Sequence, residues 1–301
     1  MRFPMIVSVA LFLSGSALAQ EGVQYSRVLL PISILEAFPV PGAFGSQWTT
    51  DLWVRNDAGV PVYMAPYYDG CHLPEGCGQY PVTAGVAWRP QSVTLDVSVP
   101  GVFFQIQRPF ENQVDIELRV RDLSRQSESW GTELPTVPEE SFTSEKVTLF
   151  DVPDSEGFRV MLRIYGIGDL DNSTVRVRTF SLDESALIPG SVPVLVSDQI
   201  VTLRSPAASL TRYVPHYAEM IPFQSVSSPG RKLIEITPAT PGLRIWAFAT
   251  VTNNETQQIT IVTPQRSADI AANKMSDAEK SPRPVLSGSR SPSVRHDSVD
   301  Q

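Results

Sequence analysis

Trp48-Thr-Thr-Asp-Leu-Trp-Val-Arg-Asn56 is the segment that decides the fold class of this chain. Its even-numbered residues from Trp48 to Val54 are mostly apolar, and the residues between them include Asp51, Trp53 and Arg55. This period of two predicts a β-strand with one face on a core. The turn residues 56–59 follow, and the segment Pro61-Val-Tyr-Met-Ala-Pro-Tyr-Tyr68 is expected to return as the second strand of a β-hairpin.

Short strand-like segments separated by turn residues continue along the chain. The clearest is 114–121, where Val114, Ile116, Leu118 and Val120 alternate with charged residues. No helical period of useful length occurs, which favours an antiparallel sandwich over residues 24–123. A second series predicts another sandwich over 140–265, with strands at 146–152, 158–165, 174–180, 200–204, 232–237, 244–251 and 258–263.

The predicted fold class is therefore all-β, with two antiparallel immunoglobulin-like β-sandwich domains in tandem and a disordered C-terminal tail; one large domain is the alternative. Residues 168–172 and 252–256 are expected to be hairpin turns. One helical turn is expected within 213–222.

The segment 124–139 is polar and rich in proline, so we expect it to connect the two domains. Trp130 is its one large aromatic residue. It is expected to pack into the seam between the domains, and the alternative is an exposed contact for a ligand.

The two ends of the chain carry compositional signals. Residues 1–19 combine a basic start, a short apolar run and the site Ala17-Leu-Ala19, as in a secretory signal peptide. A secreted or periplasmic location is therefore expected, with no membrane span in the mature chain. Residues 266–301 hold few large apolar side chains and repeat Ser, Pro and Arg, which predicts a disordered tail.

Cys71 and Cys77 are the only cysteines, in a loop rich in Gly and Pro. In an exported protein, this close pair predicts a local disulfide that stabilises the fold by about 2 kcal/mol. A metal site that includes His72 is the alternative, but the chain offers too few other histidines nearby for structural zinc.

Composition and motifs point away from most chemistries. The net charge of −8 argues against a nucleic-acid partner, which needs a clustered basic face. No esterase elbow, zinc-protease motif, P-loop or dinucleotide fingerprint occurs, so we expect no catalytic residues, no metal and no cofactor. The carboxylates Asp115, Glu117, Glu139 and Glu140 are better explained as solvated than as a glycosidase pair.

Large aromatic residues are the remaining functional lead. Trp53, Trp88 and Trp130 are candidate ligand contacts, because a stacking platform for a sugar or a peptide needs exposed rings. The alternative is that these rings are covered by the opposite sheet, a loop or the neighbouring domain.

The segment 40–56, together with Thr250-Val-Thr-Asn-Asn-Glu-Thr-Gln-Gln-Ile-Thr-Ile-Val-Thr-Pro264, resembles uncharacterised secreted bacterial proteins built of immunoglobulin-like β-sandwiches. The resemblance implies the architecture and carries no activity or catalytic residues. The expected function is an exported, non-enzymatic protein for adhesion, envelope interaction or ligand binding, with an unknown protein or glycan as partner. A carbohydrate-binding or carbohydrate-active protein that uses exposed Trp residues is the alternative.

Overall fold

The computed structural model describes residues 25–34, 36, 38–66, 80–88, 100–125, 130–168, 172–182, 192–205, 214–223 and 230–264. Over these residues the chain is all-β, as predicted, with antiparallel sheets and four short 3-10 helices. The predicted signal peptide, the Cys71 and Cys77 pair and the tail at 266–301 lie outside the described residues.

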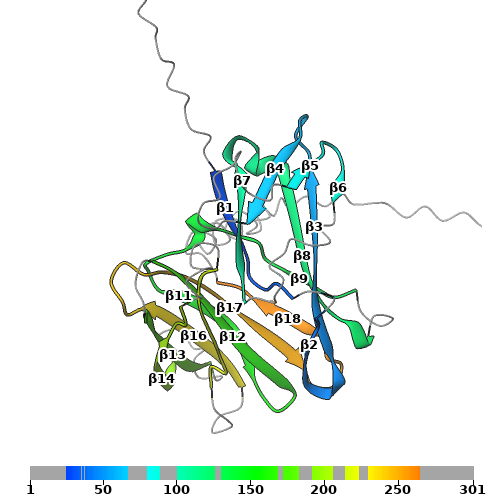
Figure 1. Cartoon of the computed structure of the whole chain (residues 1–301). Helices are drawn as coiled ribbons and strands as arrows, with labels where there is room; N and C mark the ends of the chain where they lie inside the picture. The colour runs from blue at the N-terminus through cyan, green and yellow to red at the C-terminus, as the bar shows by residue number, and fades with distance from the viewer. Residues whose placement is uncertain are drawn as a thin grey trace, which may run out of the picture.

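Two sheets formed by the first half of the chain face each other across one core (Figure 1). One has the strand order β10-β1-β7-β4-β5, and the other has the order β2-β3-β8-β9 with β6 beside β3. Their strands are β1 (Tyr25–Leu30), β2 (Val40–Pro41), β3 (Gln47–Asn56), β4 (Val62–Pro66), β5 (Tyr80–Val82), β6 (Ala87–Trp88), β7 (Val102–Gln107), β8 (Val114–Asp122), β9 (Thr132–Leu134) and β10 (Val137–Pro138). The 3-10 helices are η1 (Ala43–Gly45), η2 (Arg108–Gln113), η3 (Leu123–Arg125) and η4 (Glu139–Ser141).

The predicted alternation is confirmed for β8 and only in part for β3, where Thr49 and Asp51 of the predicted outer face are also buried. Val54 is buried and Leu52 packs against the same core, whereas Trp53 faces outward. On β8 the core residues are Leu118 and Val120.

The predicted hairpin of β3 and β4 is wrong, because the two strands belong to different sheets. The physical cause is Asn56, whose side chain is fully buried at the end of β3. Its amide nitrogen donates to the carbonyls of Val60 and Val82, at 2.9 and 2.7 Å, and its oxygen accepts from the Ala58 N–H at 2.9 Å. These bonds turn the chain across the core and tie β3 to β5 of the facing sheet.

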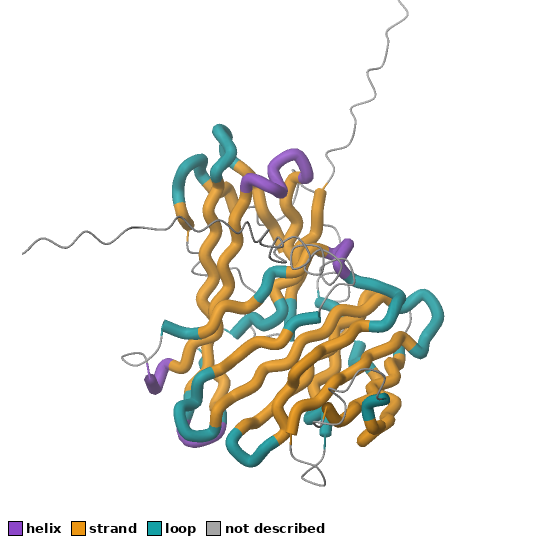
Figure 2. The backbone as a smooth tube through the Cα atoms, turned by 180° about the vertical axis from the view of Figure 1, so that it is seen from behind, coloured by secondary structure: helices purple, strands orange, loops and turns teal. Residues whose placement is uncertain are grey.

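The second half of the chain forms another pair of sheets around its own core (Figure 2). Their strand orders are β11-β16-β13-β14 and β15-β12-β17-β18. The strands are β11 (Val147–Asp154), β12 (Phe158–Ile167), β13 (Thr174–Leu182), β14 (Val194–Thr202), β15 (His216–Met220), β16 (Gly230–Pro238), β17 (Arg244–Asn253) and β18 (Ile259–Val262).

Two local predictions in this half need correction. Residues 216–220 form strand β15 instead of a helical turn, because they pair along β12 from Leu162 to Gly166. The predicted hairpin at 168–172 is wrong, because β12 and β13 on either side of it lie in different sheets. The turn at 252–256 does join the paired strands β17 and β18, as predicted.

The segment 124–139 also needs correction, because it is more than a connector. It contributes β9, which pairs with β8, and β10, which pairs with β1. Leu134 and Val137 are its buried residues in the first core. These isolated apolar side chains carry no visible period in the sequence, so the segment was predicted as polar linker.

A cluster of aromatic rings forms the seam between the two halves. On the β15-β12-β17-β18 sheet, Tyr165, Trp246 and Phe248 lie on the face turned away from the second core. They belong to the first core. The Tyr165 ring stacks on Phe248 with ring centroids 6.2 Å apart. Gly101 is needed opposite this ring, because a Cβ there would lie 2.9 Å from Tyr165 Cε1.

The Tyr165 hydroxyl anchors the seam. It donates to the carbonyl oxygen of Pro31 and lies 2.9 Å from that of Pro100, both in the first half of the chain. Complete burial raises the pKa of the Tyr165 phenol, so it stays protonated as a donor over the physiological range.

We expect Tyr165→Phe to lower the free energy of unfolding by about 1–3 kcal/mol, because the buried carbonyl of Pro31 and the partly buried carbonyl of Pro100 lose their donor. Urea denaturation followed by circular dichroism measures this change. Tyr63→Phe, at an exposed position on β4, is the control and should change the free energy by less than about 0.5 kcal/mol. Equal effects of the two substitutions would contradict the anchoring role of Tyr165.

Candidate functional site

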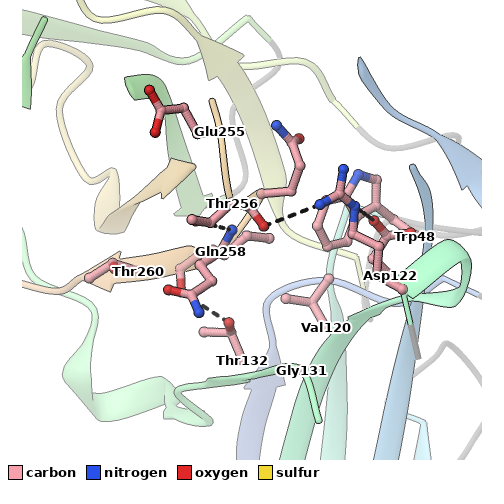
Figure 3. A pocket seen from close by; sticks show the side chains of 12 residues that line it. Trp48, Val120, Asp122, Gly131, Thr132, Glu255, Thr256, Gln258 and Thr260 are labelled. Atoms are coloured by element: carbon pink, nitrogen blue, oxygen red, sulfur yellow. Dashed lines mark hydrogen bonds and ion pairs between the residues drawn. The ribbon is translucent and has the colours of Figure 1, made fainter. Parts of the chain in front are cut away.

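A cleft of about 520 Å³ lies where the two halves of the molecule meet (Figure 3). One wall comes from β3, β8, η3 and the start of β9, and the other comes from the β17–β18 hairpin. Its lining residues are Trp48, Val120, Asp122, Arg125, Gly131, Thr132, Glu255, Thr256, Gln257, Gln258, Ile259 and Thr260. The cleft is therefore mainly polar, with an aromatic ring and two aliphatic side chains among its lining. We call it the seam cleft.

Asp122 is the most unusual residue of the seam cleft. It ends β8 and is only 8% exposed. Its Oδ1 accepts from the Gln47 N–H at 2.9 Å, the Ser124 N–H at 3.0 Å and the Ser124 hydroxyl at 2.7 Å. Its Oδ2 is buried and has no hydrogen-bond partner. Such an oxygen is costly unless something donates to it.

Arg125 is the charged neighbour of Asp122. Its Nε lies 3.8 Å from Asp122 Oδ2, which is an ion-pair distance but too long for a hydrogen bond. Its Nη1 donates to the Thr256 carbonyl at 3.4 Å across the cleft. Arg125 thus neutralises the carboxylate and leaves Oδ2 able to accept a hydrogen bond.

The opposite wall is held rigid by hydrogen bonds within the β17–β18 turn. Asn253 Oδ1 accepts from the N–H groups of Glu255 and Thr256, at 2.8 and 2.9 Å. Gln257 is buried, and its oxygen accepts from Arg159 Nη2 at 2.7 Å. The Thr132 hydroxyl donates to the Ile259 carbonyl at 3.0 Å, which joins the two walls. The cleft is therefore preformed.

Trp130 lies immediately before Gly131 of the cleft wall. Its side chain is 75% exposed, so the prediction that it packs into the seam is wrong. The guanidinium of Arg121 lies 5.8 Å from the Trp130 ring centroid. Gly131 has a φ of +96°, and a Cβ there would lie 2.6 Å from the Val120 carbonyl oxygen. The positive φ of Gly131 therefore turns the chain between Trp130 and the start of β9.

Trp53, the second predicted contact, does not line the seam cleft. Trp53 is 39% exposed on the outward face of β3, and the cleft lies on the inward side with Trp48. The backbone of Trp88 pairs with Val54, while that of Trp53 pairs with Glu117. The backbone partner of Trp88 is thus the residue after Trp53, and the Trp88 side chain is outside the described part of the structure.

The carboxylates Asp122 and Glu255 both line the seam cleft. Figure 3 shows Glu255 pointing away from Asp122 at the other end of the cleft, so these two carboxylates do not face each other. Among the described residues, no group of three His, Cys, Asp or Glu side chains could hold a metal ion. No helix in the same residues has the length and apolar character needed to cross a membrane.

Sequence reasoning missed Asp122, although a signal was present. Asp122 continues the even-numbered series from Val114 to Val120 that faces the core. A carboxylate in an inward-facing register is costly and calls for a reason. The predicted strand ends at residue 121, so Asp122 falls just outside it.

Comparison with models of protein families, with curated proteins and with solved structures finds no match to this chain. The arguments about function below therefore depend on the geometry of the chain itself.

We expect Asp122→Ala to lower the free energy of unfolding by about 1–3 kcal/mol, because the Gln47 and Ser124 N–H groups lose their acceptor. Asp122→Asn keeps an oxygen at the Oδ1 position and should cost clearly less. Parallel urea titrations of both variants measure the difference. If Asp122→Asn is as destabilising as Asp122→Ala, the stabilising role belongs to the negative charge instead of to the acceptor geometry.

Proposed function

We propose that this chain is an exported, non-enzymatic binding protein, and that its ligand is a neutral, hydroxyl-rich molecule such as a segment of polysaccharide held in the seam cleft. Asp122 lines the cleft, and its buried Oδ2, which has no hydrogen-bond donor, is the observation that carries the proposal. A sugar hydroxyl is a donor of the right kind for such an oxygen.

The rest of the lining suits the same ligand. Hydroxyls both donate and accept, and the cleft offers acceptors at Asp122 and donors at Arg125 and Gln258. The Trp48 ring adds an apolar surface for the carbon-bound hydrogens of a sugar ring. Arg125 and Asp122 carry opposite charges that balance each other. The pair therefore offers no net charge that would attract an ionised ligand, which favours a neutral one.

A recognition role also agrees with the architecture that we propose, two immunoglobulin-like sandwiches joined by a packed seam. Ligand sites often form where two domains meet, because the walls come from separate rigid bodies. Export is supported by the signal-peptide features of residues 1–19 and by the predicted disulfide of Cys71 and Cys77.

The alternative is a stacking platform on the exposed tryptophans, without the cleft. The exposure of Trp53 and Trp130 is what favours it. The two proposals make opposite predictions for substitutions at Asp122 and Trp53, because these side chains lie on opposite faces of the same sheet.

We expect the chain from Gln20 onward to bind members of a glycan array that contains neutral and acidic oligosaccharides. Asp122→Asn should weaken binding to a neutral hit at least about tenfold, because a donor replaces the acceptor that the sugar hydroxyl needs. Isothermal titration calorimetry on the best hit measures this loss.

Asp115→Asn is the matched control, since Asp115 lies on the same strand with an exposed side chain, and it should leave binding unchanged. Trp53→Ala should also leave binding unchanged. A loss in Trp53→Ala with full binding by Asp122→Asn would transfer the site to the outer face of the sheet. No binding to any glycan would refute the proposed ligand class.

A further inference from the structure

Lys232 is a lysine that points into the second half of the molecule. Lys232, Ile234 and Ile236 follow one another at every second position of β16, and all three are 0% exposed. The alternation of a strand therefore places Lys232 on the same inward face as the two isoleucines of the second core. Lysine is almost never fully buried, because its ammonium group loses its hydration there. Its position calls for a chemical reason.

Asp154 of β11 is the carboxylate beside Lys232. β11 and β16 are antiparallel neighbours, and Val152 lies opposite Lys232. Asp154 is two residues further along β11, so it is a diagonal neighbour of Lys232 on the same face. Lys232 Nζ lies 3.4 Å from Asp154 Oδ2, and the Asp154 side chain is only 14% exposed. The strand register therefore holds an amine and a carboxyl group together where little water reaches them.

A second lysine on the same two strands gives a useful contrast. Lys146 directly precedes β11, and its Nζ lies 2.5 Å from Glu235 of β16. The Lys146 side chain is 48% exposed, so its ammonium stays hydrated and charged. An ammonium has no lone pair and is not a nucleophile. The Lys232 pair has lost this hydration, and mutual attraction offsets the loss only in part. Burial, and not contact alone, sets Lys232 apart.

We propose that Lys232 and Asp154 condense to an amide that links β11 and β16 covalently. The ammonium first gives a proton to the carboxylate, which leaves two neutral groups in the low-dielectric interior. The amine lone pair then attacks the carboxyl carbon and forms the C–N bond. The carboxyl hydroxyl leaves with a second proton from the nitrogen as one molecule of water. The reaction removes two charges from a buried place, which favours the amide.

The link has a consequence for stability. It joins two strands that are far apart in the sequence, so it restricts the unfolded chain as a disulfide does. Unlike a disulfide, an amide is not opened by thiols. Neither Lys232 nor Asp154 lines the seam cleft, so this inference is independent of the ligand proposed there.

Intact-mass spectrometry of the reduced and denatured chain tests the proposal. The chain from Gln20 onward carries an added methionine before Gln20, because an N-terminal glutamine can cyclise with loss of ammonia. The measured mass should be lower than the mass calculated from the sequence by one water, about 18 Da. Proteolysis should also release a branched peptide that joins the segments around Asp154 and Lys232.

Variants assign the link to this pair. Lys232→Arg and Asp154→Ala should each show the full mass calculated for their sequence, because one reacting group is missing. Lys146→Arg is the matched control at an exposed lysine, and it should still show the loss of water. Circular dichroism establishes that the unchanged chain has folded. A folded, unchanged chain with its full calculated mass overturns the proposal. So does a loss of water that persists in Lys232→Arg, or a branched peptide that joins other residues.

Discussion

The fold depends on a sheet that is covered on both faces. In the β15-β12-β17-β18 sheet, Leu162 and Ile164 face the second core, while Tyr165 and Trp246 face the first. Burial on both faces explains why β17 has an almost continuous run of buried residues without alternation. Because the Tyr165 hydroxyl is buried by this packing, it needs a hydrogen-bond acceptor. It donates to the carbonyl oxygens of Pro31 and Pro100 in the first half.

The seam that Tyr165 fixes also creates the cleft. The packing of β17 against the first core positions the β17–β18 turn opposite β8, η3 and β9. The bond from Thr132 to Ile259 and the bond from Arg125 to Thr256 then set the spacing of the two walls. Because neither wall is complete alone, any change that loosens the seam also changes the cleft. Stability of the seam and the shape of the cleft are therefore coupled.

Much of this architecture could be predicted from local sequence patterns. The alternations in 48–56, 114–121 and 174–180 correctly gave both the strands and their inward faces, because a period of two depends only on the residues of one strand. Pairing between strands was less accessible. The turn after Asn56 looks like a hairpin turn in the sequence, and only the bond from Asn56 to Val82 shows that the chain crosses to the facing sheet. The seam cleft was beyond prediction, because it joins Asp122 to residues near 256 that no local pattern connects.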